Sequence, residues 1–366
     1  RIAAPIYKIQ IGLLVSMKMR NEDACSSATN KRLHSSMVLQ CFFQAILFSY
    51  MIVGSTSSET PLNNLSNHPQ PRRFGRVSRD EYIITPEQIE CFRKEGCTML
   101  PDVLTEEEVD EISHTFNQFL NREIHVPGKD FCDMSKPFET PFEEWSIVNC
   151  MLPTRYHPPF QNNVYERLSA CIARQLFPSL DMTKDYDQLL NKRPGKGDAV
   201  FAWHQDMGYW PGPKALGVSE TSTVTCSLAV DDSDPSNGCL GYVAGSGVEK
   251  KLRPHVPVGE SRDDAHALMI DVDESKGDII KLAPAKRGSV TIHDEYVVHG
   301  SGGNSCPDRQ RRTYVVAFRP KAVVDAERRI GFTHSHNDDV NWDNFNDGEE
   351  RKRDINGAKE ESKIEE

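Results

Sequence analysis

Short β-type runs dominate the second half of the chain and restrict its fold more than any other feature. From about Tyr186 onward, Val224–Val230, Ser289–His293 and Thr313–Phe318 are rich in Val, Thr and aromatic residues. Gly, Pro and Asp turns separate these runs, which is typical of antiparallel strands. We therefore predict an antiparallel sheet region from residue 186 to about residue 320.

Helix signals precede this region. One helix is predicted from Thr85, an N-cap followed by Pro, to Gly96, and a second begins after Thr105. The short strand Cys97–Leu100 lies between them, and a third helix is predicted over residues 162–176. Helices first and antiparallel strands later predict an α+β domain, a double-sheet jelly roll (a cupin-like double-stranded β-helix) flanked by N-terminal helices.

The chain divides into three parts by composition. Residues 1–80 form a leader and a polar linker, residues 81–325 the folded domain, and residues 326–366 a polar, flexible tail. Within the leader, the apolar run 37–54 resembles a signal peptide, although an anchor or a stray helix stays open. The location is accordingly either cytoplasmic or one reached through the secretory pathway or an organelle.

Composition also limits the partners. The net charge of -11 disfavours nucleic acid, because neutralising phosphates needs a basic surface. The ten cysteines include no CxxC pair, so we expect reduced thiols rather than a zinc knuckle or a disulfide framework. We expect a small-molecule substrate, a monomer or weak oligomer, and no membrane contact by residues 81–325.

The most informative motif is His204-Gln-Asp206, which two tryptophans and a tyrosine surround. Residues two apart on a strand project from the same face, so the imidazole and the carboxylate converge. With a distant second histidine they would form the two-His-one-carboxylate triad of non-haem Fe(II) oxygenases. Such a triad leaves three coordination positions open, two for a chelating 2-oxo acid and one for O2.

His299 is the candidate for the second histidine, because a β-type run ends there in a Gly-Ser-Gly turn. His293 lies on the same face by period-2 counting, and we expect it to be an interior histidine near the site. Arg311 and Arg312 open the next strand, and a guanidinium there can pair bidentately with the far carboxylate of a dicarboxylate cosubstrate.

At this point the chain resembles the phytanoyl-CoA dioxygenase family from about Ile84 to Pro320. The shared features, in chain order, are the opening Thr-Pro-Glu-Gln helix with Gly96–Pro101, Leu189–Gly195, Trp203–Asp206, Asp231–Leu240, Gly245-Ser246, and His299-Gly-Ser-Gly with Arg311-Arg312. So many ordered motifs make the resemblance specific for the family but leave the substrate open.

The resemblance implies a role for each matching residue. It implies iron on His204, Asp206 and His299. It also implies three contacts to 2-oxoglutarate, from the Arg311 side chain, from the Ser301 hydroxyl and from Asn191.

Two points about the cosubstrate pocket stay open. Arg312 is expected to face solvent on a regular strand, although a β-bulge would exchange it with Arg311. The family often carries Trp in the strand after the His-Gln-Asp motif, where this chain has Ser227. This departure leaves one wall of the cosubstrate pocket undefined.

The remaining histidines and the aromatic residues near the His-Gln-Asp motif are not expected to bind the metal. Surface positions are predicted for four histidines: His255, His266, His334 and His336. Either core packing or a place in the substrate wall is expected for three aromatic residues: Trp203, Tyr209 and Trp210. No basic cluster suited to coenzyme A phosphates stands out, although Lys250, Lys251 and Arg253 could serve.

We thus predict an Fe(II)- and 2-oxoglutarate-dependent dioxygenase that uses O2 to hydroxylate a C–H bond of a small molecule, releasing succinate and CO2. Two alternatives are a non-oxygenase metal enzyme on the same jelly roll and an inactive binding relative. Both are disfavoured, because the former needs no dicarboxylate clamp and the latter no complete triad.

Overall fold

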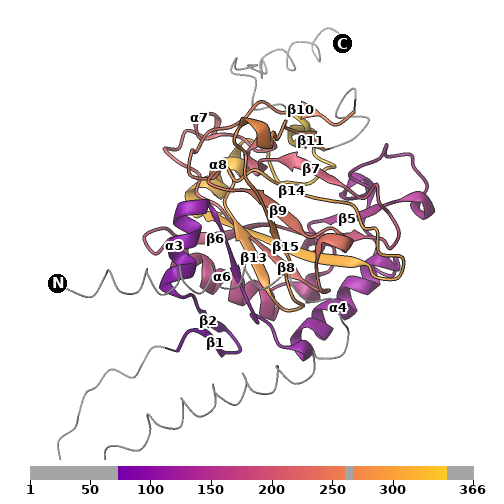
Figure 1. Cartoon of the computed structure of the whole chain (residues 1–366), viewed down its shortest axis with the longest axis horizontal. Helices are drawn as coiled ribbons and strands as arrows, with labels where there is room; N and C mark the ends of the chain where they lie inside the picture. The colour runs from indigo at the N-terminus through magenta and orange to yellow at the C-terminus, as the bar shows by residue number, and fades with distance from the viewer. Residues whose placement is uncertain (1–72, 260–266, 344–366) are drawn as a thin grey trace, which may run out of the picture. The chain divides into compact units, whose positions relative to one another are not determined.

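The computed structural model describes residues 73–259 and 267–343, all within the unit that begins at residue 70. Its centre is a pair of antiparallel sheets that face each other (Figure 1). The larger sheet has the order β3 (Cys97–Leu100), β13 (Val290–His293), β8 (Val224–Ala229), β15 (Arg311–Pro320), β6 (Met182–Lys192), β5 (Ile147–Met151), β4 (Phe131–Cys132). The smaller has the order β12 (Ile280–Ala283), β9 (Leu240–Val243), β14 (His299–Ser301), β7 (Phe201–His204). The predicted α+β jelly roll is confirmed.

Two small hairpins accompany the sheets. They pair β1 (Gly75–Ser78) with β2 (Glu81–Ile83), and β10 (Val256–Pro257) with β11 (Leu268–Met269). The second hairpin lies beside β7 on the side of the smaller sheet (Figure 1).

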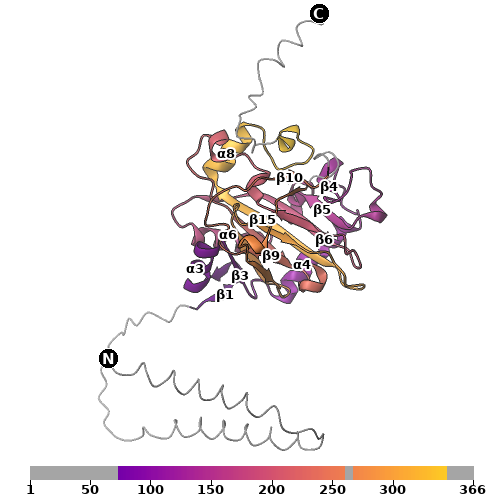
Figure 2. The same ribbon diagram turned by 45° about the horizontal axis from the view of Figure 1, so that its top comes forward.

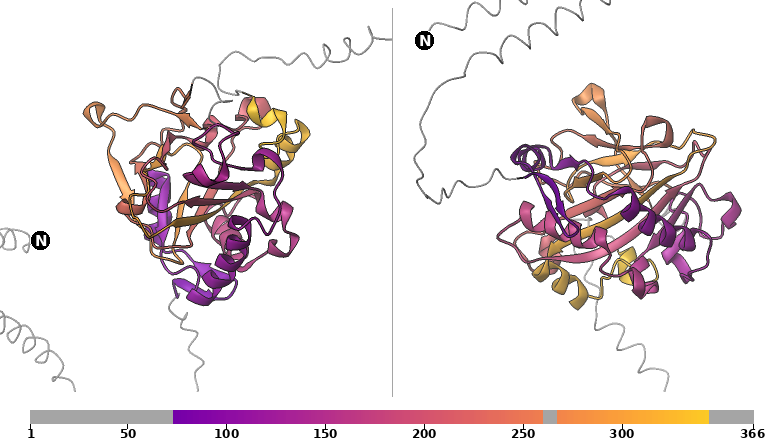
Figure 3. Two further views of the ribbon diagram at one scale, coloured as in Figure 1. Left: turned by 90° about the vertical axis from the view of Figure 1, so that its right-hand side faces the viewer. Right: turned by 90° about the horizontal axis from the view of Figure 1, so that it is seen from below.

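The predicted helices form where their capping residues lie. The helices are α3 (Pro86–Glu95), α4 (Glu106–Leu120), α5 (Pro153–Tyr156), α6 (Val164–Leu176), α7 (Pro213–Leu216) and α8 (Lys321–Arg329). Thr85 and Thr105 each close a capping box, and Gly96 ends α3 in the left-handed conformation. Helix α6 packs on β6, β15 and β8 and shares one core with α3 and α4, so these three helices cover the face of the large sheet that points away from the smaller one (Figures 2 and 3).

Period-2 alternation divides each central strand between two environments. On β15, Tyr314, Val316 and Phe318 enter the core beneath the helices. Arg311 and Thr313, with the opposite parity, line a cavity between the two sheets. Strands β6, β8 and β13 alternate in the same way: Leu190, Thr225 and His293 line the cavity, while their neighbours Leu189, Cys226 and Ile292 enter the core.

The folded region is longer at both ends than the predicted domain of residues 81–325. Strand β1 begins at Gly75, inside the predicted linker. The prediction of a flexible tail is wrong for residues 326–343, because Phe332 and His334 are buried against the larger sheet and α8 carries the buried Glu327. Polar composition misled the prediction, since buried charges there are paired with one another.

Two further predictions concern the thiols and the leader. The eight cysteines within the described residues are all free thiols, as expected. No helix in those residues is long and apolar enough to cross a membrane. The apolar run 37–54 and His266 lie outside the described residues.

Gly288 couples the start of α4 to the large sheet and provides a test of the fold. Its carbonyl accepts hydrogen bonds from Val103 and Leu104, its φ is +82°, and a Cβ there would lie 2.6 Å from the Leu104 carbonyl oxygen. Gly288→Ala should lower the free energy of unfolding by more than the roughly 1–2 kcal/mol expected for the left-handed backbone alone. Gly195→Ala is the matched control, because its φ is +68° and its Cβ would meet nothing within 4 Å. Equal losses in urea unfolding would contradict the proposed clash.

Candidate functional site

Strand pairing brings the three candidate ligands together at one end of the cavity. Strands β7 and β14 place His204 directly opposite His299, and Asp206 follows two residues after His204 in a short 3-10 turn. Asp206 Oδ1 lies 3.7 Å from His204 Nε2 and 3.5 Å from His299 Nε2. One donor atom from each residue lies within 4.8 Å of the other two, which a single metal ion can bridge.

Backbone hydrogen bonds fix the orientation of both imidazoles. His204 Nδ1 lies 2.7 Å from the Ala202 carbonyl oxygen, and His299 Nδ1 lies 2.9 Å from the Val297 carbonyl oxygen. A carbonyl can only accept, so each Nδ1 carries the proton and each Nε2 keeps its lone pair. Metal-binding histidines are commonly held in this way.

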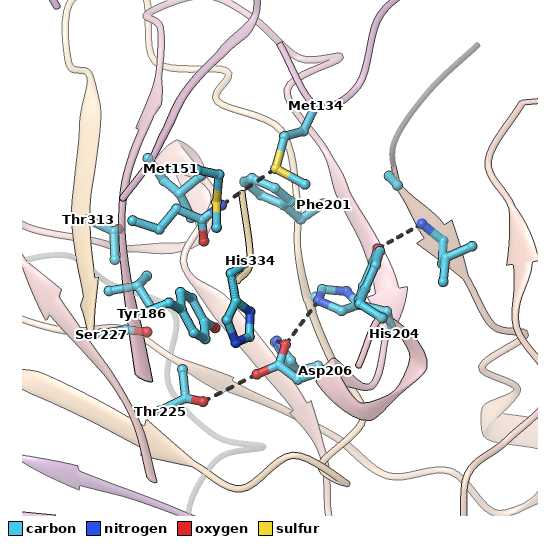
Figure 4. A pocket seen from close by; sticks show the side chains of 18 of the residues that line it. Met134, Met151, Tyr186, Phe201, His204, Asp206, Thr225, Ser227, Thr313 and His334 are labelled. Carbon is cyan, nitrogen blue, oxygen red and sulfur yellow. Dashed lines mark hydrogen bonds and ion pairs between the residues drawn. The ribbon is translucent and has the colours of Figure 1, made fainter. Parts of the chain in front are cut away.

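The second oxygen of Asp206 is held from the larger sheet. Oδ2 lies 3.3 Å from His293 Nε2 and 3.3 Å from the Thr225 hydroxyl (Figure 4). Because these contacts use Oδ2, Oδ1 alone faces His204 and His299. His293 is buried beside the triad without joining it, so it is an interior histidine near the site, which period-2 counting alone could not separate from His299.

The electrostatics of the triad suit a divalent cation. Burial opposes ionisation of Asp206, but the neighbouring histidines, including the His293 imidazole that is hydrogen-bonded to Oδ2, outweigh it and hold the pKa of that carboxyl far below its usual range. Burial also lowers the pKa of His204 and of His299, so both imidazoles stay neutral. Two neutral imidazoles and one carboxylate are the protonation states that metal binding requires.

Arg311 and Arg312 have opposite environments. The buried Arg311 side chain lines the cavity, and no carboxylate among the described residues forms an ion pair with it. Arg312 instead binds Asp231 through two nitrogens, at 2.7 and 3.0 Å, and Ser113 of α4 at 2.6 Å. The expectation that Arg312 faces solvent is wrong, because its side of β15 is covered by α4; no bulge lies between the two arginines.

Two other predicted cosubstrate contacts do not reach the cavity wall. Asn191 projects to the helix side of β6, between cavity-facing Leu190 and buried Lys192. Ser301 is buried, and its hydroxyl accepts a hydrogen bond of 2.6 Å from Lys192 Nζ. The cavity wall at Arg311 is formed instead by small side chains, Ser227 among them.

The cavity also has an aromatic and polar lining that the sequence analysis missed in part. Tyr209 and Trp210 belong to it, whereas Trp203 packs outside against Gly241. The residues not anticipated include Met134, Met151, Tyr186, Gln188 and Asn341. These residues are separated from the His-Gln-Asp motif in sequence, so local spacing carried no signal for them.

The histidines that were expected to be solvated are not. His334 and His336 are each 3% exposed, and both line the cavity. His255 is half-buried: its Nδ1 donates to the Arg253 carbonyl oxygen at 2.8 Å, and its Nε2 accepts from the Gln205 backbone at 3.0 Å. His255 thereby holds the residue between His204 and Asp206.

Comparison with known proteins agrees with this geometry. The model of the family described as phytanoyl-CoA dioxygenase matches residues 92–313. The ectoine dioxygenase of Halomonas elongata is 26% identical over 277 residues, covering 71% of this chain and 78% of that protein. The ectoine dioxygenase of Nocardia farcinica is 24% identical over 250 residues, covering 63% of this chain and 76% of its own.

Solved structures share the architecture. EvdO2 from Micromonospora carbonacea var. aurantiaca, complexed with 2-oxoglutarate, superposes with a TM-score of 0.53 at 23% identity. The match covers 65% of this chain and 91% of that one. At this identity the likeness concerns the fold.

The hydrogen bond from the Gln205 backbone to His255 predicts a pH dependence of stability. Burial lowers the pKa of His255 to about 4 from its ordinary 6.5. The unfolded chain therefore binds a proton at this residue before the folded chain does, and stability falls as the pH drops from 6.5 to 4. His255→Gln should show a smaller loss over this window in urea unfolding at stepped pH. Identical slopes for the two proteins would contradict the assignment.

Proposed function

The chain belongs to the phytanoyl-CoA dioxygenase family and is an Fe(II)- and 2-oxoglutarate-dependent dioxygenase, and on that premise we propose that His204, Asp206 and His299 bind the iron. The observation that carries the proposal is the convergence of two Nε2 lone pairs and Asp206 Oδ1. The proton on each Nδ1 is already committed to a carbonyl, so the donors fit a ferrous ion without rearrangement.

Arg311 is proposed to bind the far carboxylate of 2-oxoglutarate. A guanidinium that is buried at the wall of a cavity, without a described carboxylate partner, is costly unless a ligand neutralises it. Its fixed fork matches a carboxylate bidentately. Since Arg312 is already neutralised by Asp231, the geometry favours Arg311 for this role.

The bound iron, with 2-oxoglutarate and O2, supplies oxidative decarboxylation to succinate and CO2 and the oxidant for a C–H bond. The residues of this chain orient the reactants and exclude water. His293 and Thr225 hold Asp206 Oδ2, and Tyr186 and Trp210 wall the cavity beyond the triad. We propose that a small-molecule substrate binds between these aromatic walls.

The proposed cavity does not favour an acyl-coenzyme A. The basic residues that could serve its phosphates are largely engaged: Lys250 Nζ lies 2.7 Å from Asp294, and Arg253 pairs with Asp278 at 2.9 Å. Binding phosphates would require breaking these pairs. We therefore propose a substrate without a nucleotide.

Removal of one iron ligand should abolish turnover. His299→Gln is expected to lose iron and to lower 2-oxoglutarate-dependent succinate formation by at least about 100-fold, because a metal-activated oxidant cannot form without its site. His293→Gln is the matched control, since His293 lies beside the triad but outside it. It should retain iron when the metal content is measured. Loss of iron from His293→Gln but not from His299→Gln would reverse the assignment.

The proposed binding of 2-oxoglutarate by Arg311 is tested by comparing variants of Arg311 and of the adjacent Arg312. Arg311→Gln should raise KM for 2-oxoglutarate about 10- to 100-fold, the effect of losing a charged hydrogen-bonded partner, with iron content unchanged. Arg312→Gln should instead lower Tm, because Asp231 loses its bidentate partner, and leave KM nearly unchanged. Succinate assays at varied 2-oxoglutarate and thermal melts measure both. A larger KM effect in Arg312→Gln would refute the role of Arg311.

A further inference from the structure

We propose that the substrate carries a carboxylate or another anionic group and that His334 binds it at the end of the cavity away from Arg311. This inference rests on the proposed function, since it concerns the substrate of the same site. It names His334 as a specificity-determining residue. Metal binding and 2-oxoglutarate binding do not require it.

His334 lies within the substrate end of the cavity. Its ring stacks on Tyr186, with centroids 4.4 Å apart and planes at 26°, and meets Trp210 edge-on at 5.6 Å. It comes from the segment after α8, which folds back to close the cavity. Figure 4 shows its imidazole between Tyr186 and the metal-ligand candidate Asp206. A group that binds His334 would therefore hold the remainder of the substrate near the iron ligands.

A buried charge cluster favours the cationic form of His334. Its Nε2 lies 2.8 Å from Asp185 and 3.9 Å from Glu327, and both carboxylates are fully buried. Burial opposes protonation, but the attraction of Asp185 outweighs it and raises the pKa of His334. The imidazole is thus an ion-pair donor and a poor candidate for a metal ligand.

The buried charges around His334 balance, and His334 is the cation among them that faces the cavity. Asp185 and Glu327 carry two negative charges, and Arg319 and Arg328 carry two positive charges. The buried Glu295, which also attracts Arg319, offsets the third positive charge, that of protonated His334. Among these six residues only His334 lines the cavity. The positive charge of His334 therefore faces the space that the substrate would occupy.

The remaining described cavity wall offers a cationic substrate no free carboxylate. Among the described lining residues the only carboxylate is Asp206, which the iron would use. Arg311, the only permanently charged cation there, is assigned to 2-oxoglutarate. A substrate ammonium would find no free carboxylate in the described wall, whereas an anion would find His334.

Three probes of nearly equal size test the inference directly. The full-length protein is loaded with Fe(II) and saturating 2-oxoglutarate under anaerobic conditions, and the optical charge-transfer band of the complex is recorded. Cyclohexanecarboxylate, cyclohexanecarboxamide and cyclohexylmethylamine are then titrated separately. A probe at the substrate end shifts the band, whereas displacement of 2-oxoglutarate removes it. Absence of the band before any probe is added would count against the proposed function and not against the anion site.

We expect the carboxylate to bind wild-type protein at least about tenfold more tightly than the amide, and the amine more weakly than either. His334→Gln, which keeps a polar side chain but no charge, should bring the acid and the amide within about twofold. The exposed His125→Gln is the matched histidine control and should keep the full preference. An intact band in His334→Gln also verifies that this variant is folded.

Two results would overturn the inference. The first is a wild-type protein that binds the amide or the amine more tightly than the acid. A wild-type protein that shows no preference for the acid at probe concentrations up to about 0.1 M, well above the range of weak ion-paired ligands, would count in the same way. The wild-type series alone decides this point, even if the variant fails to fold. The second is a preference for the acid that persists undiminished in His334→Gln, which would place the anion elsewhere in the cavity.

Discussion

The alternation of side chains along the strands of the large sheet is the constraint on which the rest of the structure depends. One parity of β15 enters the core beneath the helices, and the other lines the cavity. A shift of one residue would bury Arg311 under α4 and bring Tyr314 into the cavity. The apolar core therefore sets the register, and the register decides which polar residues can do chemistry.

The strand register brings the three triad residues together, and polar contacts then fix the orientation of their side chains. Backbone carbonyls orient His204 and His299, and the larger sheet holds the spare oxygen of Asp206 through His293 and Thr225. The smaller sheet thus supplies both imidazoles, while the larger sheet steadies the carboxylate between them. Neither sheet alone could build the site, which explains why it lies between them.

Much of the fold was predictable because its signals are local. The capping boxes at Thr105 and Thr85 and the glycine after α3 placed those helices correctly. The proposed iron ligands followed from the His-Gln-Asp spacing and the distal His299, and the family resemblance added Arg311 as the proposed 2-oxoglutarate ligand. Asn191 and the supposed tail failed for different reasons: the parity of a long strand cannot be counted from a motif several residues away, and composition alone does not reveal that charges will be paired in the interior.

The sequence by itself determined the chemistry of this protein: the His-Gln-Asp motif, the distal His299 and an arginine pair opening the last long strand identify its family and its reaction. Only the tertiary structure decided which arginine faces the cavity and what else surrounds it. His334 joins the cavity wall although 130 residues separate it from His204, because α8 turns the chain back and the buried carboxylates of Asp185 and Glu327 pair with it. Such partners are distant along the chain, so their charges cannot be balanced until the fold brings them together.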